Sequence, residues 1–154
     1  MKAFLCSAAV LFTGMAMADI TPRDGWKVHP TDKPFARLLD DVKSAVKANK
    51  MGVVTQAGPT GAAKSRGIEI PNNRVVGVFN NRFAVKILGL SEVAMIEAPI
   101  RLYLTENEDG TATLSYKTPT YVFKPYMEEA GEELANEASK LDEIFDAIAT
   151  AAAQ

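Results

Sequence analysis

IRLYLTENEDGTATLSY, residues 100–116, carries the clearest structural pattern in the chain. Apolar and polar residues alternate over residues 100–105 and again over residues 111–116, which is typical of two strands that each bury one face. Between them, residues 107–110 read Asn-Glu-Asp-Gly and supply the residues that tight turns require. The stretch therefore predicts a β-hairpin.

The polar face of this predicted hairpin offers a candidate site. Arg101 and Tyr103 lie on the face opposite Leu102, and Tyr116 follows on the second strand. If a helix or a second subunit covers the Arg101 face, an arginine and aromatic hydroxyls line a partly enclosed pocket, to which Glu97 adds a carboxylate. If that face is open to water, the same side chains are ordinary surface residues.

Outward from the hairpin, helical and strand patterns alternate along the chain. The apolar spacing of three and four residues predicts an amphipathic helix over residues 34–49, and a β-branched run predicts a buried central strand over residues 74–79. A long C-terminal helix is expected to begin near Glu128. These patterns predict an α+β protein with a single compact domain, in which a mixed β-sheet packs against helices. Shorter predicted elements are strands over residues 26–29 and 51–56 and a short helix near residues 62–65. The apolar spacing of Phe83, Ile87 and Leu90 predicts a further helix, with Asn80 or Asn81 as its N-cap and Gly89 near its end.

A second candidate site lies where the strand over residues 74–79 passes into the next helix. Asn80 and Asn81 precede Arg82 and Lys86, and a helix N-terminus presents unpaired backbone N–H groups that attract anions. These four residues could hold a carboxylate, phosphate or sulfur oxyanion. The alternative is that an asparagine caps the helix and that both basic side chains face water.

The first residues have the features of a secretory signal peptide. One lysine precedes an apolar run, and Ala16-Met17-Ala18 has the small residues that signal peptidase recognises. We expect cleavage after Ala18, a mature chain of residues 19–154 that forms one domain, and a location in the periplasm or outside the cell. No later apolar stretch is long enough to span a membrane.

Charge and composition limit the possible functions. The whole chain has 17 Lys and Arg against 19 Asp and Glu, and this acidic balance argues against nucleic acid as a partner. Cys6 is the only cysteine and lies in the predicted leader, while His29 is the only histidine. Cysteine-type zinc sites, multi-histidine metal sites and serine-histidine triads that use a histidine other than His29 therefore lack their residues, and we expect no metal and no cofactor.

Several short motifs together resemble domain-of-unknown-function family 302. The resemblance implies a small α+β fold with a mixed sheet, a homodimer and no established activity, with its core over about residues 53–119. The matching residues are Ala63, Gly67, Glu69, the run Arg74–Asn80, Ala98-Pro99, Glu106, Asp109-Gly110, Ser115-Tyr116, Pro119 and Leu141-Asp142.

No complete catalytic constellation is present in the sequence. The leading hypothesis is therefore a non-enzymatic exported module that binds a small anion, a metabolite or a partner protein. The alternative is an enzyme of unknown class that uses a pocket around Arg101, Tyr116 and Glu97.

Overall fold

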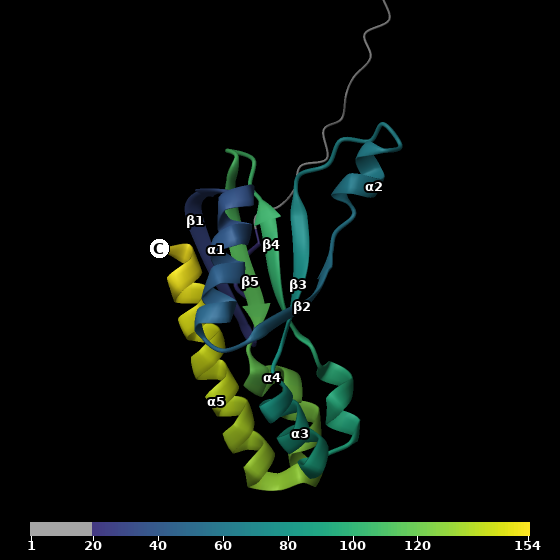
Figure 1. Ribbon diagram of the computed structural model, residues 1–154, viewed down its shortest axis with the longest axis vertical. Helices are drawn as coiled ribbons and strands as arrows, with labels where there is room; N and C mark the ends of the chain where they lie inside the picture. The colour runs from purple at the N-terminus through teal and green to yellow at the C-terminus, as the bar shows by residue number, and fades with distance from the viewer. Residues whose placement is uncertain (1–19) are drawn as a thin grey trace, which may run out of the picture.

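A five-stranded β-sheet in the order β1-β5-β4-β3-β2 organises the protein (Figure 1). The computed structural model describes residues 20–154, so the predicted cleavage after Ala18 lies outside the described residues. The strands are β1 (Trp26–Pro34), β2 (Gly52–Ala57), β3 (Asn73–Phe79), β4 (Ile100–Glu106) and β5 (Thr111–Lys117). The helices are α1 (Phe35–Ala48), α2 (Thr60–Lys64), α3 (Asn81–Leu90), η1 (Val93–Glu97), α4 (Pro119–Phe123), η2 (Lys124–Tyr126) and α5 (Met127–Ala153).

The predicted α+β class and the β4–β5 hairpin are confirmed, but the prediction of a mixed sheet is wrong. All four strand pairings are antiparallel. The mixed-sheet prediction rests on the interleaving of predicted helices and strands. Instead, α1 connects the two opposite edge strands, and α3 with η1 returns the chain to the end of the sheet where β3 finished. Strand β3 is also next to an edge rather than central.

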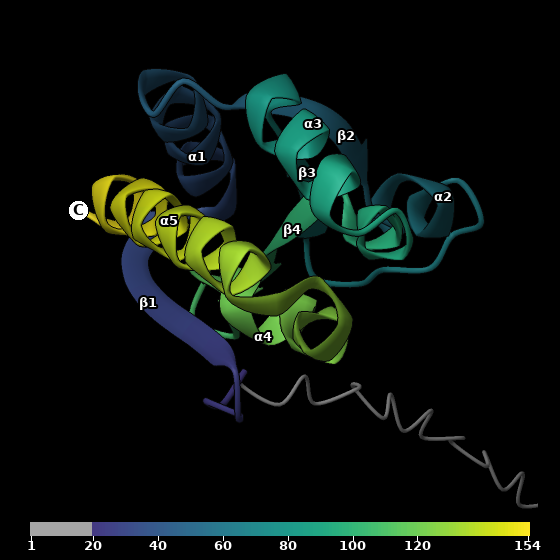
Figure 2. The ribbon, with the colours of Figure 1, turned by 90° about the horizontal axis from the view of Figure 1, so that it is seen from below.

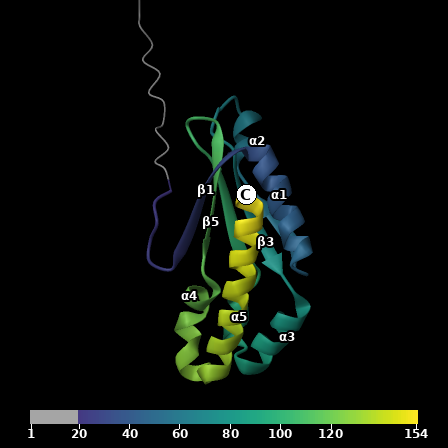
Figure 3. The same ribbon diagram turned by 90° about the vertical axis from the view of Figure 1, so that its left-hand side faces the viewer.

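Helices α1 and α5 lie together on one face of the sheet (Figures 2 and 3). We call this the covered face and the opposite one the open face. The alternation seen in the sequence decides which side chains enter the core, because Leu102, Leu104 and Leu114 all point to the covered face and are fully buried. Leu38 of α1 and Phe145 of α5 meet them there, also fully buried.

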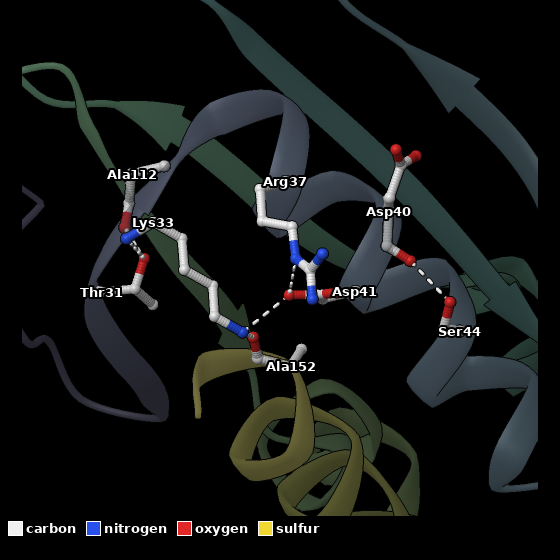
Figure 4. Close-up of polar contacts among 8 residues, drawn as sticks. All are labelled: Thr31, Lys33, Arg37, Asp40, Asp41, Ser44, Ala112 and Ala152. Atoms are coloured by element: carbon white, nitrogen blue, oxygen red, sulfur yellow. Dashed lines mark hydrogen bonds and ion pairs between the residues drawn. The ribbon is translucent and has the colours of Figure 1, made fainter.

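A lysine fastens the start of α1 to the end of α5. The Lys33 Nζ donates hydrogen bonds to Asp41 Oδ2 (2.7 Å) and to the backbone oxygen of Ala152 (2.8 Å), as Figure 4 shows. The hydrogen bond from Lys33 holds the pKa of Asp41 below its usual range, with a further contribution from Arg37. Because carbonyls in the last turn of a helix lack helical partners, Lys33 also caps α5.

Strand β1 runs further than its sequence predicts. The predicted strand covers residues 26–29, yet β1 continues through Pro30 to Pro34. Because β1 is an edge strand, a residue without an N–H group can remain in it.

Three of the helical elements gather at one end of the sheet. Helices α3 and α4 and the first turns of α5 lie beyond the strand ends at this end of the molecule (Figures 1 and 3). The predicted C-terminal helix is confirmed over Met127–Ala153, with a break at Gly131, whose φ is 71°. The short helix α4 was not predicted. No helix within residues 20–154 is long and apolar enough to cross a lipid bilayer.

Candidate functional site

A groove of about 240 Å³ lies where the open face meets α4, and we call it the Arg101 groove. Strand register explains its composition, because Val75 pairs with Tyr103 and Trp26 pairs with Lys117, which places these side chains on the same face as Arg101. Its lining is mostly apolar or aromatic. The lining residues are Trp26, Val75, Glu97, Ile100, Arg101, Tyr103, Tyr116, Lys117 and Val122.

Two exposed cations, Arg101 and Lys117, border the groove. Within residues 20–154, neither forms an ion pair or a side-chain hydrogen bond. The Lys117 Nζ lies 6.0 Å from the centre of the Trp26 ring, and the Arg23 Cζ lies 5.6 Å from it. Such cation–π contacts place positive charge beside the indole and leave the donors free to bind another group.

The carboxylate of the groove is held by a neighbouring helix. The Tyr126 hydroxyl donates a hydrogen bond of 2.8 Å to Glu97 Oε1, and this bond raises the pKa of Tyr126. Glu97 forms no ion pair with Arg101 or Lys117, although all three line the groove. The groove therefore carries one oriented carboxylate and two cations.

Tyr116 reaches the groove from the covered face. It pairs with Leu102 rather than with a residue of the Arg101 face, and only 2% of it is exposed. Its ring lies 6.1 Å from that of His29 and 5.8 Å from that of Phe145. Burial raises the pKa of the Tyr116 hydroxyl, with smaller contributions from nearby carboxylates, so the hydroxyl stays protonated at neutral pH. The predicted Arg101, Tyr116 and Glu97 thus line one groove.

Comparison with known protein families identifies the family of this chain. Residues 27–150 match the sequence model of a family described as "Domain of unknown function DUF302". The chain belongs to the DUF302 family. The match extends well beyond the core of residues 53–119 that the sequence motifs predicted, and it includes most of β1, which supplies Trp26 to the groove.

A solved structure has the same fold as this DUF302 chain. It is the crystal structure of the uncharacterized conserved protein DUF302 from Bacillus stearothermophilus, with a TM-score of 0.73 and 15% sequence identity. The superposition covers 84% of this chain and 98% of the other. No curated protein sequence matches the chain significantly.

The second predicted site of this DUF302 chain, at the start of α3, has a different geometry. Asn80 is the N-cap, since its Oδ1 accepts a hydrogen bond of 2.8 Å from the Arg82 N–H. The Lys86 Nζ contacts Glu137 Oε1 at 3.1 Å, so Lys86 turns toward α5 rather than toward the helix start. Asn81 and the Arg82 side chain remain exposed. The structure therefore does not gather these four residues around one ligand position.

Sequence reasoning missed the Trp26 and Lys117 side of the groove. Trp26 is the only tryptophan of the chain and follows Arg23, which is a signal that could have drawn attention to it. Its position opposite Lys117 depends on the pairing of β1 with β5, two strands that lie far apart in the sequence. Nothing in either local sequence indicates that pairing.

No group of three or more His, Cys, Asp or Glu residues is placed to hold a metal ion in the part of the chain that the structure describes. One carboxylate of the hairpin turn, that of Asp109, stabilises the turn itself. Asp109 Oδ1 accepts hydrogen bonds from the N–H and the hydroxyl of Thr111, which lower the pKa of Asp109. This supports the interpretation of residues 107–110 as a turn.

Proposed function

We propose that this DUF302 protein is a binding module for a small organic anion with an apolar body, and that the Arg101 groove is its site. The observation that carries this proposal is the pair of free cations, Arg101 and Lys117, beside an apolar and aromatic surface. A carboxylate or phosphate would accept hydrogen bonds from the Arg101 guanidinium, while an apolar body would cover Trp26 and Val75. A volume of about 240 Å³ limits the ligand to a small molecule.

Binding has more support than catalysis in this groove. The alternative hypothesis makes Arg101, Tyr116 and Glu97 act on a substrate. Tyr116 is buried and its raised pKa keeps the hydroxyl protonated, so it is poorly suited to accept a proton. Binding, by contrast, requires only that Arg101 and Lys117 meet a ligand of opposite charge.

Calorimetric titration with matched ligands tests the proposal. Benzoate and phenyl phosphate carry an anion on an apolar ring, and benzamide is a neutral analogue of the first. We expect the two anions to bind and benzamide to bind at least about tenfold more weakly, because a hydrogen bond to a charged group contributes about 1.5–3 kcal/mol. Affinity for the anions should also fall as salt rises.

Three alanine variants locate the site. Arg101→Ala should weaken the binding of benzoate by about tenfold or more, because it removes the bidentate donor. Arg82→Ala tests the rival position at the start of α3, and Arg66→Ala removes an exposed arginine that lines neither position. Equal losses in all three variants, or no binding of either anion at millimolar concentration, would contradict the proposal.

We also propose that the module works in the periplasm or outside the cell. Support comes from the Ala16-Met17-Ala18 pattern after an apolar run. The intact mass of the exported protein tests this, because a mature chain should begin at Asp19. A product that retains Met1 in the extracytoplasmic fraction would contradict it.

A further inference from the structure

The carboxylate of Glu97 is the feature of the Arg101 groove that a simple anionic ligand leaves unused. Its Oε1 accepts the hydrogen bond of 2.8 Å from the Tyr126 hydroxyl. Within residues 20–154, Glu97 forms no ion pair, and no side chain donates a hydrogen bond to its Oε2. One oxygen of a carboxylate that Tyr126 holds in place is therefore available to a ligand.

This carboxylate affects which ligands the groove accepts. A ligand that carries only an anion and an apolar body would displace water from Glu97 and bring a second negative charge near it, and both effects cost free energy. Arg101 and Lys117 attract the anion, but neither is paired with Glu97 in the described residues. A ligand that brings a positive charge of its own to Glu97 avoids both costs.

We propose that the ligand of the Arg101 groove is an α-amino acid with an apolar or aromatic side chain, an inference that rests on the function proposed above. The ligand carboxylate accepts hydrogen bonds from the Arg101 guanidinium, and the ligand ammonium donates one to Glu97. The ligand side chain covers Trp26 and Val75. Glu97 thus determines specificity, while Arg101 supplies the attraction for the anion.

The size and the arrangement of the groove fit such a ligand. Its volume of about 240 Å³ suits a molecule of the size of one amino acid. Glu97 is the last residue of η1 and Arg101 the second residue of β4, so the two charged groups border the same end of the groove. An α-amino acid carries its ammonium and its carboxylate on one carbon atom, and its side chain extends away from both.

Three ligands with the same phenyl group separate the contributions of the two charges. L-Phenylalanine carries both charges, 3-phenylpropanoate lacks the ammonium and 2-phenylethylamine lacks the carboxylate. In calorimetric titrations of the wild type, phenylalanine should bind at least about tenfold more tightly than either analogue, because each analogue loses a hydrogen bond between charged groups.

Glu97→Gln tests the residue that makes this distinction. The glutamine amide oxygen can still accept the hydrogen bond from Tyr126, so the local structure should be kept while the negative charge is removed. The variant should bind phenylalanine more weakly and 3-phenylpropanoate more tightly, so that the tenfold preference is lost. A folding defect would weaken the binding of both ligands together. Glu92→Gln removes an exposed carboxylate that does not line the groove and should keep the wild-type preference.

Failure of this inference differs from failure of the function on which it rests. A wild type that binds 3-phenylpropanoate as tightly as phenylalanine, or a Glu97→Gln protein that keeps the preference, would overturn the amino-acid ligand and leave anion binding intact. If phenylalanine, 3-phenylpropanoate and benzoate all fail to bind at millimolar concentration, both proposals are wrong.

Discussion

Adjacent residues of strand β4 point to its two faces and differ sharply in burial. Leu102 and Leu104 are fully buried beneath α1 and α5, whereas Arg101 is exposed and Tyr103 is partly exposed on the open face. Five strands and two long helices stabilise the covered face through apolar burial. On the open face, the end near α4 carries two cations beside an apolar groove, and neither has an ion-pair partner among residues 20–154.

If the Arg101 groove binds an anion as proposed, one alternating stretch supplies stability through one face of β4 and binding through the other. A substitution on the covered face should change the free energy of unfolding, whereas one at the Arg101 groove should change the affinity for a ligand. The comparison is useful because the residues involved are neighbours in sequence.

The largest expected effect is that of Leu102→Ala. Leu102 is fully buried between the sheet and the helices, so we expect a loss of about 2–5 kcal/mol in the free energy of unfolding. Arg101→Ala, one residue away, should change it by no more than about 0.5 kcal/mol, because surface substitutions rarely do more. Chemical denaturation of both variants measures the difference. Similar losses would show that the open face also contributes to the core.

Sequence patterns predicted the local features of both faces well. The period of two in residues 100–105 indicated both Leu102 as core and Arg101 as part of a candidate pocket, because side-chain direction in a strand follows from local geometry. Partnerships between distant segments could not be predicted. Lys86 pairs with Glu137 across 51 positions, which turns a predicted anion ligand into half of an ion pair. Whether a cation is free is therefore a property of the folded chain.

Gly77→Ala tests whether a position on the open face can also affect the stability of the fold. Gly77 faces this side beside Arg101, but a Cβ added there would collide with Thr55 Oγ1 and come within 2.8 Å of Pro99. We expect a loss of about 1–3 kcal/mol in the free energy of unfolding, because overpacking forces neighbouring atoms to shift. Gly61→Ala adds a methyl group in open space and is the control. An unchanged stability of Gly77→Ala would mean that Pro99 moves freely.

Asp142→Ala should have a smaller effect on the free energy of unfolding. It tests a link between α5 on the covered face and the groove on the open face. The Asp142 carboxylate accepts hydrogen bonds from the Thr120 N–H (2.9 Å) and hydroxyl (2.7 Å), which anchor the start of α4 to α5. Loss of this anchor should cost about 1–2 kcal/mol, as for other capping side chains. Since Val122 of α4 lines the groove, anion binding should weaken as well. Glu143→Ala is the control, and an Asp142→Ala protein as stable as this control would contradict the anchoring role.

The smallest expected effect concerns His29, at the edge of the covered face. Its ring stacks on Tyr116, and its Nε2 is buried without a hydrogen-bond partner among the described residues. Burial lowers the pKa of His29 below its ordinary value of 6.5, Lys27 adds to this, and Asp146 opposes it. The covered face therefore disfavours the charged imidazole, even though a carboxylate is near.

The sign of the resulting pH dependence follows from the lowered pKa. As pH falls below 6.5, the unfolded chain binds a proton at His29 before the folded chain does, so the unfolded state is favoured. The stability contributed by the neutral imidazole is complete above 6.5 and is lost as pH falls through the pKa of the folded state. His29→Phe keeps an aromatic ring beside Tyr116 and removes the titration. Denaturation curves at about pH 8 and about pH 5 should show the wild type losing more stability than His29→Phe, in a window where carboxylates remain mostly ionised. Equal losses would mean that His29 is as well solvated in the folded protein as in the unfolded chain.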